Sequence, residues 1–116
     1  MKFRKNPKRM WRDRLRELAV IYGSGVAVQK RNAAADELRA LIREIGSTDE
    51  IDELLSLLDD PKLGAWIAYG VLQQCPTTST QRKLCVNVIR SISRGDGPDA
   101  LAAQSWLSEN GEEETP

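Results

Sequence analysis

The sequence predicts an all-α protein, a right-handed stack of about three antiparallel helix pairs with five to six helices in total. The first observation behind this fold class is an apolar segment that ends at Asp59-Asp60-Pro61 and is followed at once by a second apolar segment. The second is that apolar residues recur every three or four positions, as on one face of a helix. The third is that no strand-like alternation of useful length occurs. Paired helices therefore account for the chain better than a sheet does.

The first two helices are predicted from their apolar stripes and from their end signals. Asn6 and Pro7 are a polar cap followed by proline at the first helical position, so the first helix should begin there. It should end at Gly23-Ser24-Gly25. The second helix should cover about residues 26–45 and close at Gly46 in the left-handed conformation. The two stripes consist of Trp11, Leu15, Leu18 and Tyr22, and of Ala34, Leu38, Leu41, Ile42 and Ile45.

The third and fourth helices form the apolar pair that defines the fold class. Ser47 and Glu50 fit a capping box at the start of the third helix, which should run to Leu58. Asp60-Pro61 is again a cap followed by proline, so it should begin the fourth helix. This helix should reach about Gln74, where a Cys-Pro-Thr-Thr segment ends it.

The fourth, fifth and sixth helices carry further local signals. Gly64 and Gly70 fall inside the fourth helix, where each glycine costs about 1 kcal/mol relative to alanine, so they predict close helix–helix approach. Thr78 and Gln81 can form a capping box at the start of the fifth helix. A Gly-Asp-Gly turn follows, and Pro98 should open the sixth helix.

The length of 116 residues indicates one domain. We expect a flexible basic leader over residues 1–5, a single helical domain over residues 6–109, and a disordered acidic tail over residues 110–116. The longest apolar run is far too short to cross a bilayer. The basic N-terminus is not followed by the apolar region of a secretory signal. These features predict a cytoplasmic protein.

The composition excludes several kinds of chemistry. The chain has no histidine, so it cannot build a Ser-His-Asp or Cys-His nucleophile. Its two cysteines, Cys75 and Cys85, are too few for an all-cysteine zinc site and are better explained as free, buried thiols than as a disulfide. The sequence therefore predicts no metal, no cofactor and no enzymatic activity.

Charge is distributed unevenly although the formal net charge is zero. Residues 2–16 are rich in lysine and arginine, whereas residues 47–60 contain acidic residues and no basic ones. The acids near the start of the third helix can be explained by the helix dipole, and the last two by the turn. They can also form a negative surface for a basic partner, since complementary fields speed association. The acidic candidates for partner contact are Asp49, Glu50, Asp52, Glu53, Asp59 and Asp60.

Aromatic residues supply the second set of candidates. Trp66 and Tyr69 lie three positions apart on the predicted fourth helix and so share a face. Either they are buried in the core, or one of them is exposed as an anchor for a partner. Trp11 and Trp106 are assigned to the core. Trp11 also belongs to the basic N-terminal segment, where it could instead stack on a base.

The central segment, about residues 49–74, resembles a HEAT-type repeat through its Leu-Leu-Ser-Leu-Leu-Asp-Asp-Pro turn. Gly64-Ala65 stands where such repeats often have Val-Arg, which argues against a long regular solenoid. Over about residues 10–109 the chain resembles a bacterial family of small HEAT-like helical domains without an assigned function. Proteins of this kind are similar to immunity proteins of bacterial toxin systems. The residues that carry the wider resemblance are Lys30, Arg31, Asn32, Asp36, Leu38, Leu57, Leu58 and Asp59.

These observations lead to one functional hypothesis and two alternatives. The hypothesis is a non-enzymatic protein-binding module, and the resemblance implies an immunity or antitoxin-type inhibitor that occludes a cognate toxin, such as a basic nuclease. One alternative is an accessory protein that binds nucleic acid through residues 2–16. The other is an oligomeric adaptor. We expect a monomer or weak dimer that does not interact with membranes.

Overall fold

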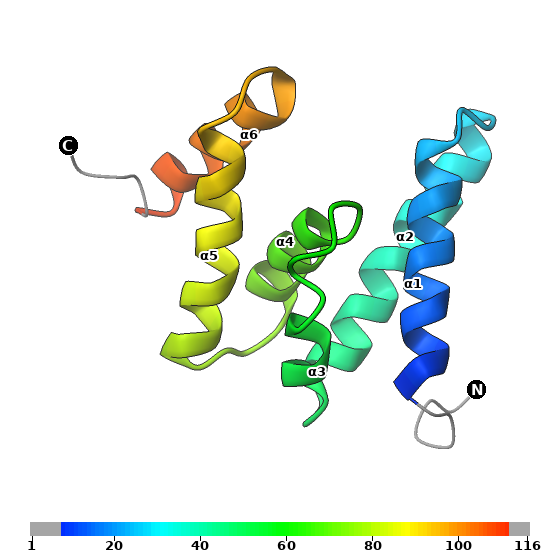
Figure 1. Ribbon diagram of the computed structural model, residues 1–116, viewed down its shortest axis with the longest axis horizontal. Helices are drawn as coiled ribbons and strands as arrows, with labels where there is room; N and C mark the ends of the chain where they lie inside the picture. Colours follow the sequence, from blue (N-terminus) through cyan, green and yellow to red (C-terminus); the bar gives the residue numbers. More distant parts are fainter. Residues whose placement is uncertain (1–7, 112–116) are drawn as a thin grey trace.

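The computed structural model describes residues 8–111, which contain six α-helices and no β-strand (Figure 1). The all-α fold class predicted from the sequence is therefore confirmed. The right-handed superhelical stacking of the pairs stays a prediction. The helices are α1 (Lys8–Gly23), α2 (Val28–Gly46), α3 (Ile51–Leu55), α4 (Gly64–Gln74), α5 (Ser79–Ser93) and α6 (Pro98–Glu109).

The helices pack as a sequence of neighbours. α1 packs on α2, α2 on α4, α4 on α5, and α5 on α6, while the short α3 contacts α2, α4 and α5. Figure 1 shows this order running from α1 and α2 on one side to α5 and α6 on the other. The resulting body measures 47 × 36 × 20 Å, so it is broad and thin. The central helix α4 is largely covered, since Gln73 is the one residue of this helix that is exposed.

The predicted apolar stripes form one continuous core. Trp11, Leu15 and Leu18 of α1 are buried as predicted, whereas Tyr22 is only half-buried. Among the residues whose burial is described, none of the buried side chains is charged or polar. The largest fully buried aliphatic side chains are Leu15, Leu18, Leu38, Ile42, Leu54, Leu63, Ile67, Val71 and Ile89.

Some glycines at the helix contacts lie so close to neighbouring atoms that a larger side chain would collide with them. A Cβ atom on Gly70 would lie 2.8 Å from Ile42 Cγ2, which confirms the close approach of α4 and α2. Gly64 also has no room for a side chain, although its neighbour is the carbonyl oxygen of Leu58. Gly46 is the last residue of α2 and does not adopt the predicted left-handed conformation. A Cβ atom there would lie 2.6 Å from Cys75 Sγ, so any other residue would force the Cys75 side chain to shift, whereas the φ angle makes no demand for glycine.

The predicted capping box of Ser47 and Glu50 is wrong. Ser47 belongs to the end of α2, where its N–H donates to the carbonyl oxygens of Arg43 and Ile45. Glu50 precedes α3 without a side-chain cap, and its N–H donates to Thr48 Oγ1 at 3.1 Å. α3 is consequently shorter than predicted, because the residues before it complete the preceding helix and a turn.

The fourth helix begins later than predicted, at Gly64. Asp60 does not cap α4 as predicted, because its Oδ1 accepts from the N–H groups of Lys62 at 2.8 Å and Leu63 at 3.2 Å and so closes the turn before the helix. Pro98 opens α6 as predicted. The predicted start at Asn6-Pro7 and the leader over residues 1–5 lie outside the described residues. Of the predicted tail, residues 112–116 also lie outside them.

The predicted capping box of α5 is confirmed. Thr78 Oγ1 accepts from the N–H of Gln81 at 3.1 Å, and Gln81 Oε1 accepts from the N–H of Thr78 at 2.9 Å. Replacing Thr78 by alanine should lower the free energy of unfolding by about 1 kcal/mol, measured by urea denaturation followed by circular dichroism. Thr80→Ala is the control, since Thr80 is exposed in the same turn. Equal losses for the two variants would contradict the capping role.

Candidate functional site

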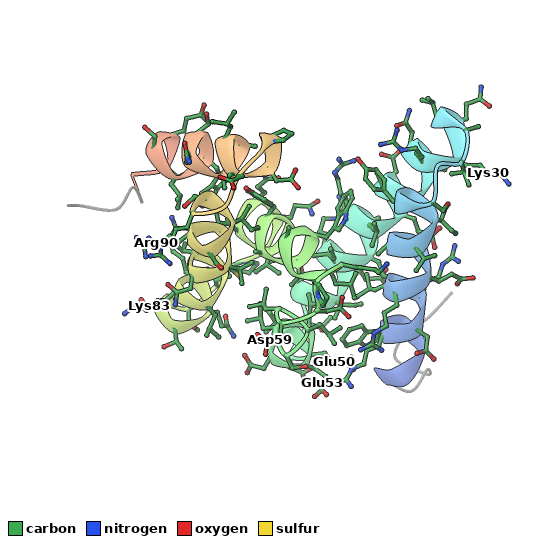
Figure 2. All side chains as sticks on the ribbon, turned by 45° about the horizontal axis from the view of Figure 1, so that its top comes forward. Lys30, Glu50, Glu53, Asp59, Lys83 and Arg90 are labelled. Atoms are coloured by element: carbon green, nitrogen blue, oxygen red, sulfur yellow. The ribbon has the colours of Figure 1, made fainter. Side chains whose placement is uncertain are left out.

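Three of the acidic candidates connect α1 to the segment that contains α3. Trp11 Nε1 donates to Glu50 Oε1 at 2.9 Å. Arg12 forms an ion pair with Glu53, and Arg16 Nε lies 3.5 Å from Asp60 Oδ2. In Figure 2, Glu50 and Glu53 lie together at one edge of the molecule, beside the start of α1. These carboxylates therefore hold the first helix against the rest of the fold.

Of the remaining acidic candidates, one forms a hydrogen bond within the chain and two are exposed to solvent. Asp52 Oδ1 accepts a hydrogen bond from Gln81 Nε2 at 3.0 Å. Asp49 and Asp59 are exposed. Four of the six acidic candidates thus have partners within the chain, but only Glu53 and Asp60 have their charge offset by an arginine.

The described part of the basic N-terminal segment is also engaged with the fold. Arg14 Nε and Nη2 donate to the two carboxylate oxygens of Glu37, each at 2.7 Å, and Arg14 Nη1 donates to Glu17 at 2.9 Å. The hydrogen bonds from Arg14 hold the pKa of Glu37 below its usual value. This pair fastens α1 to α2 on the exposed side of their contact.

The low pKa of Glu37 predicts a pH-dependent contribution to stability. A carboxylate whose pKa is lower in the folded than in the unfolded chain stabilises above its unfolded pKa, and this stabilisation is lost as pH falls through the folded value. Because both side chains are partly exposed, Glu37→Gln should cost about 0.2–1 kcal/mol at pH 7. Urea denaturation should show the difference from the wild type shrinking below about pH 4.5. Glu44→Gln, at an exposed position on the same helix, is the control, and a constant difference across pH would contradict the assignment.

Trp66 and Tyr69 lie together in an open groove along α4. They are joined there by Tyr22 from the end of α1 and Trp106 from α6, and all four aromatic side chains are half-buried. The groove has a volume of about 740 Å³. A smaller hollow of about 320 Å³ continues it towards α2 and shares Trp66 and Tyr69 with it. Three helices, α1, α4 and α6, therefore contribute rings to one concave aromatic surface.

The four rings form two edge-to-face pairs. The centroids of Tyr22 and Trp66 lie 5.1 Å apart with an interplanar angle of 85°, and those of Tyr69 and Trp106 lie 6.0 Å apart at 78°. Edge-to-face geometry is favoured by the charge distribution of aromatic rings and helps to fix their positions. The pairs link α1 to α4 and α4 to α6, helices that are not neighbours in the packing order, so the ring contacts help to preform the aromatic surface.

Charged side chains stand at opposite ends of this surface. At the α2 end, the guanidinium carbon of Arg31 lies 5.0 Å from the ring centroid of Tyr22, and that of Arg39 lies 5.5 Å from the ring of Trp66. At the α6 end, Asp99 and Glu109 line the groove. The surface therefore has a basic end and an acidic end separated by apolar rings.

Sequence reasoning found two members of this surface and missed two. The sequence predicts Tyr22 as part of the apolar stripe of α1 and Trp106 as a core residue. Trp106 packs against the core but also lines the groove. A usable signal was the spacing on α6, where Asp99, Ala102, Trp106 and Glu109 recur every three or four residues and thus share one face.

The two thiols are not part of this groove. Cys85 is buried, Cys75 is half-buried, and both are free, as predicted. Burial raises the pKa of Cys85 to about 11, so the thiolate is disfavoured at neutral pH.

Neither a metal site nor a membrane span is found in the part of the chain that the structure describes. Residues 8–111 hold no group of three metal-ligating side chains of the histidine, cysteine, aspartate or glutamate type. No helix within the same residues combines the length and the apolar character that crossing a bilayer requires. Comparisons of the chain with protein-family models, with curated proteins and with solved structures found no match.

Proposed function

We propose that this protein is a non-catalytic binding module that holds a segment of a protein partner in the aromatic groove. The observation that carries the proposal is the convergence of Tyr22, Trp66, Tyr69 and Trp106 on one concave face. Tryptophan and tyrosine are the residues that most often anchor protein interfaces, because they bury a large area at a small cost in side-chain entropy. Their rings are held in place by edge-to-face contacts before any partner arrives.

The charges of the groove favour a protein segment as its occupant. Arg31 at one end and Asp99 and Glu109 at the other can each meet an opposite charge on the partner, whereas Arg39 is already paired with Asp36 at 3.5 Å. A polypeptide segment can present acidic, apolar and basic side chains in that order, whereas nucleic acid presents negative charge along its whole length. Arg12, Arg14 and Arg16 are paired with carboxylates of the chain, which weakens the case for nucleic-acid binding through α1.

We further propose that the partner is a toxin and that the protein acts as its immunity-type inhibitor in the cytoplasm. The support for this finer assignment is the resemblance to small HEAT-like bacterial domains. A rigid helical body seated on a toxin would block access of its substrate. Asp49 and Asp59, which are exposed, would add attraction for a basic toxin without being buried in the contact.

Site-specific photocrosslinking in the native host tests the proposal. p-Benzoylphenylalanine is placed at Gln73, an exposed residue that lines the groove, or at Gln29, an exposed residue outside both hollows at the start of α2. A protein adduct that forms from position 73, is absent from position 29 and is outcompeted by the unlabelled wild-type chain supports the proposal.

The other outcomes of this experiment contradict the proposal in distinguishable ways. An adduct containing only a second copy of this chain would favour the oligomeric adaptor. An adduct with nucleic acid would favour the accessory protein. Equal adducts from positions 73 and 29 would show that the groove does not select a partner. Identification of the captured protein by mass spectrometry then tests whether it is a toxin.

A further inference from the structure

We infer that the α6 side of the groove binds a cationic side chain of the partner, an arginine guanidinium or a lysine ammonium, against the Tyr69–Trp106 pair and within the negative field of the α6 carboxylates. This inference rests on the proposed function and adds the chemistry of the bound segment. It derives from the difference between the two ends of the aromatic surface, from the charge of α6 and from the position of its carboxylates.

At the α2 end, two aromatic rings of this surface already have arginine side chains stacked on them. Arg31 is positioned over the ring of Tyr22 and Arg39 over the ring of Trp66, so each of these two aromatic faces already carries a guanidinium group of the chain itself. The second ring pair is different. No arginine or lysine from the described residues stacks on Tyr69 or Trp106. This pair therefore offers aromatic faces to a cation from outside.

The charges around the second pair favour a positive ligand. The larger hollow is lined by Asp99 and Glu109 from α6 and by one basic residue, Lys62. α6 itself contains no lysine or arginine that could neutralise its two acids. The negative charge of Asp99 also raises the pKa of Tyr69, after the larger effect of burial, which places that charge close to the aromatic pair.

The helix dipole explains the position of only one of the two carboxylates on α6. Asp99 lies in the first turn of α6, where the helix dipole favours a negative charge. Glu109 is the last residue of the same helix, where the dipole disfavours it. A role for Glu109 in ligand binding explains why an acid at this unfavourable end also lines the groove.

An NMR titration of the full chain tests the inference with defined probes. The probes are acetyl-Gly-Arg-Leu-Arg-Gly-amide and the same peptide with citrulline, the neutral analogue of arginine, at both arginine positions. The readout is the indole N–H signal of Trp106, identified with a Trp106→Phe variant, and that of the buried Trp11 serves as the internal reference. The arginine peptide should shift the Trp106 signal saturably and bind about three- to tenfold more tightly than the citrulline peptide.

Matched variants separate the groove from general charge effects. Asp99→Asn and Glu109→Gln should each weaken binding of the arginine peptide about three- to tenfold. Asp96→Asn removes the same charge from the turn before α6, outside both hollows, and should leave binding unchanged. Equal binding of the arginine and citrulline peptides, or equal effects of the three substitutions, would overturn the inference.

The two proposals fail independently. If the arginine peptide binds at Trp106 but no protein is captured from position 73, the protein-binding function is wrong and the cation site stands. If a protein is captured from position 73 and its capture is unaffected by the double variant D99N/E109Q, the binding function stands and the cation site is wrong.

Discussion

Replacing Trp11 by alanine is expected to lower the free energy of unfolding by about 3–5 kcal/mol. The side chain is only 1% exposed and packs in the main core, so its removal leaves a large cavity. The substitution also deprives Glu50 of its hydrogen bond from Trp11 Nε1, which joins positions 39 residues apart. Because a domain of this size is stable by about 5–15 kcal/mol, urea denaturation should show a strongly lowered midpoint or a chain that is already partly unfolded.

Two further variants of α1 separate the contributions of packing and hydrogen bonding. Trp11→Phe keeps an aromatic ring but loses the bond to Glu50, so it should cost clearly less than the alanine variant. Val20→Ala truncates a side chain of the same helix that is 52% exposed, and should change stability by no more than about 0.5 kcal/mol. If Trp11→Ala costs no more than Val20→Ala, α1 is not docked as the structure describes.

The second large effect is expected at Gly64. A Cβ atom at this position would lie 2.4 Å from the carbonyl oxygen of Leu58, which is a backbone atom and cannot move without shifting the turn before α4. Because Gly64 is the first residue of α4, Gly64→Ala gains less than the about 1 kcal/mol of helix propensity expected in a helix interior, and it suffers overpacking that typically costs about 1–3 kcal/mol. The contact with backbone puts this site at the upper end of that range, so we expect net destabilisation, measured by urea denaturation.

Gly23→Ala is the matched control for this substitution. Gly23 is the last residue of α1, and a Cβ atom there would meet nothing within 4 Å. The same chemical change should therefore be neutral or stabilising at Gly23 and destabilising at Gly64. Similar stabilisation at both sites would show that the turn at Leu58 yields easily and that the close contact is not a constraint.

The sequence predicted correctly those features that are set by residues close together in the chain, namely the apolar helix stripes and the capping box of α5. The stripe of Trp11, Leu15 and Leu18 is buried because a helix places these residues on one face whatever it packs against. The capping box of Thr78 and Gln81 formed because both partners belong to one turn. The same kind of pattern failed at Ser47, because the end of α2 extends through that position and uses its N–H group.

The candidate site could be predicted only in part because it depends on contacts between distant residues. Trp66 and Tyr69 were recognised from their spacing on one helix, and both line the groove. Tyr22 and Trp106 join them only through the way α1 and α6 are packed, which no local pattern specifies. The pairing of Glu53 with Arg12 likewise links residues 41 positions apart, so the sequence alone left Glu53 as a candidate for partner contact.

The sequential packing of the helices also bears on how binding specificity could change during evolution. α6 supplies one whole wall of the groove, yet it is anchored mainly on α5, and its buried side chains are Ala100, Ala103 and Leu107. Its groove-facing positions can therefore vary while these three residues stay fixed, with little effect on the folding of α1 to α4. Under the proposed function, related chains would exchange one ligand for another by mutating the groove-facing residues of α6 alone.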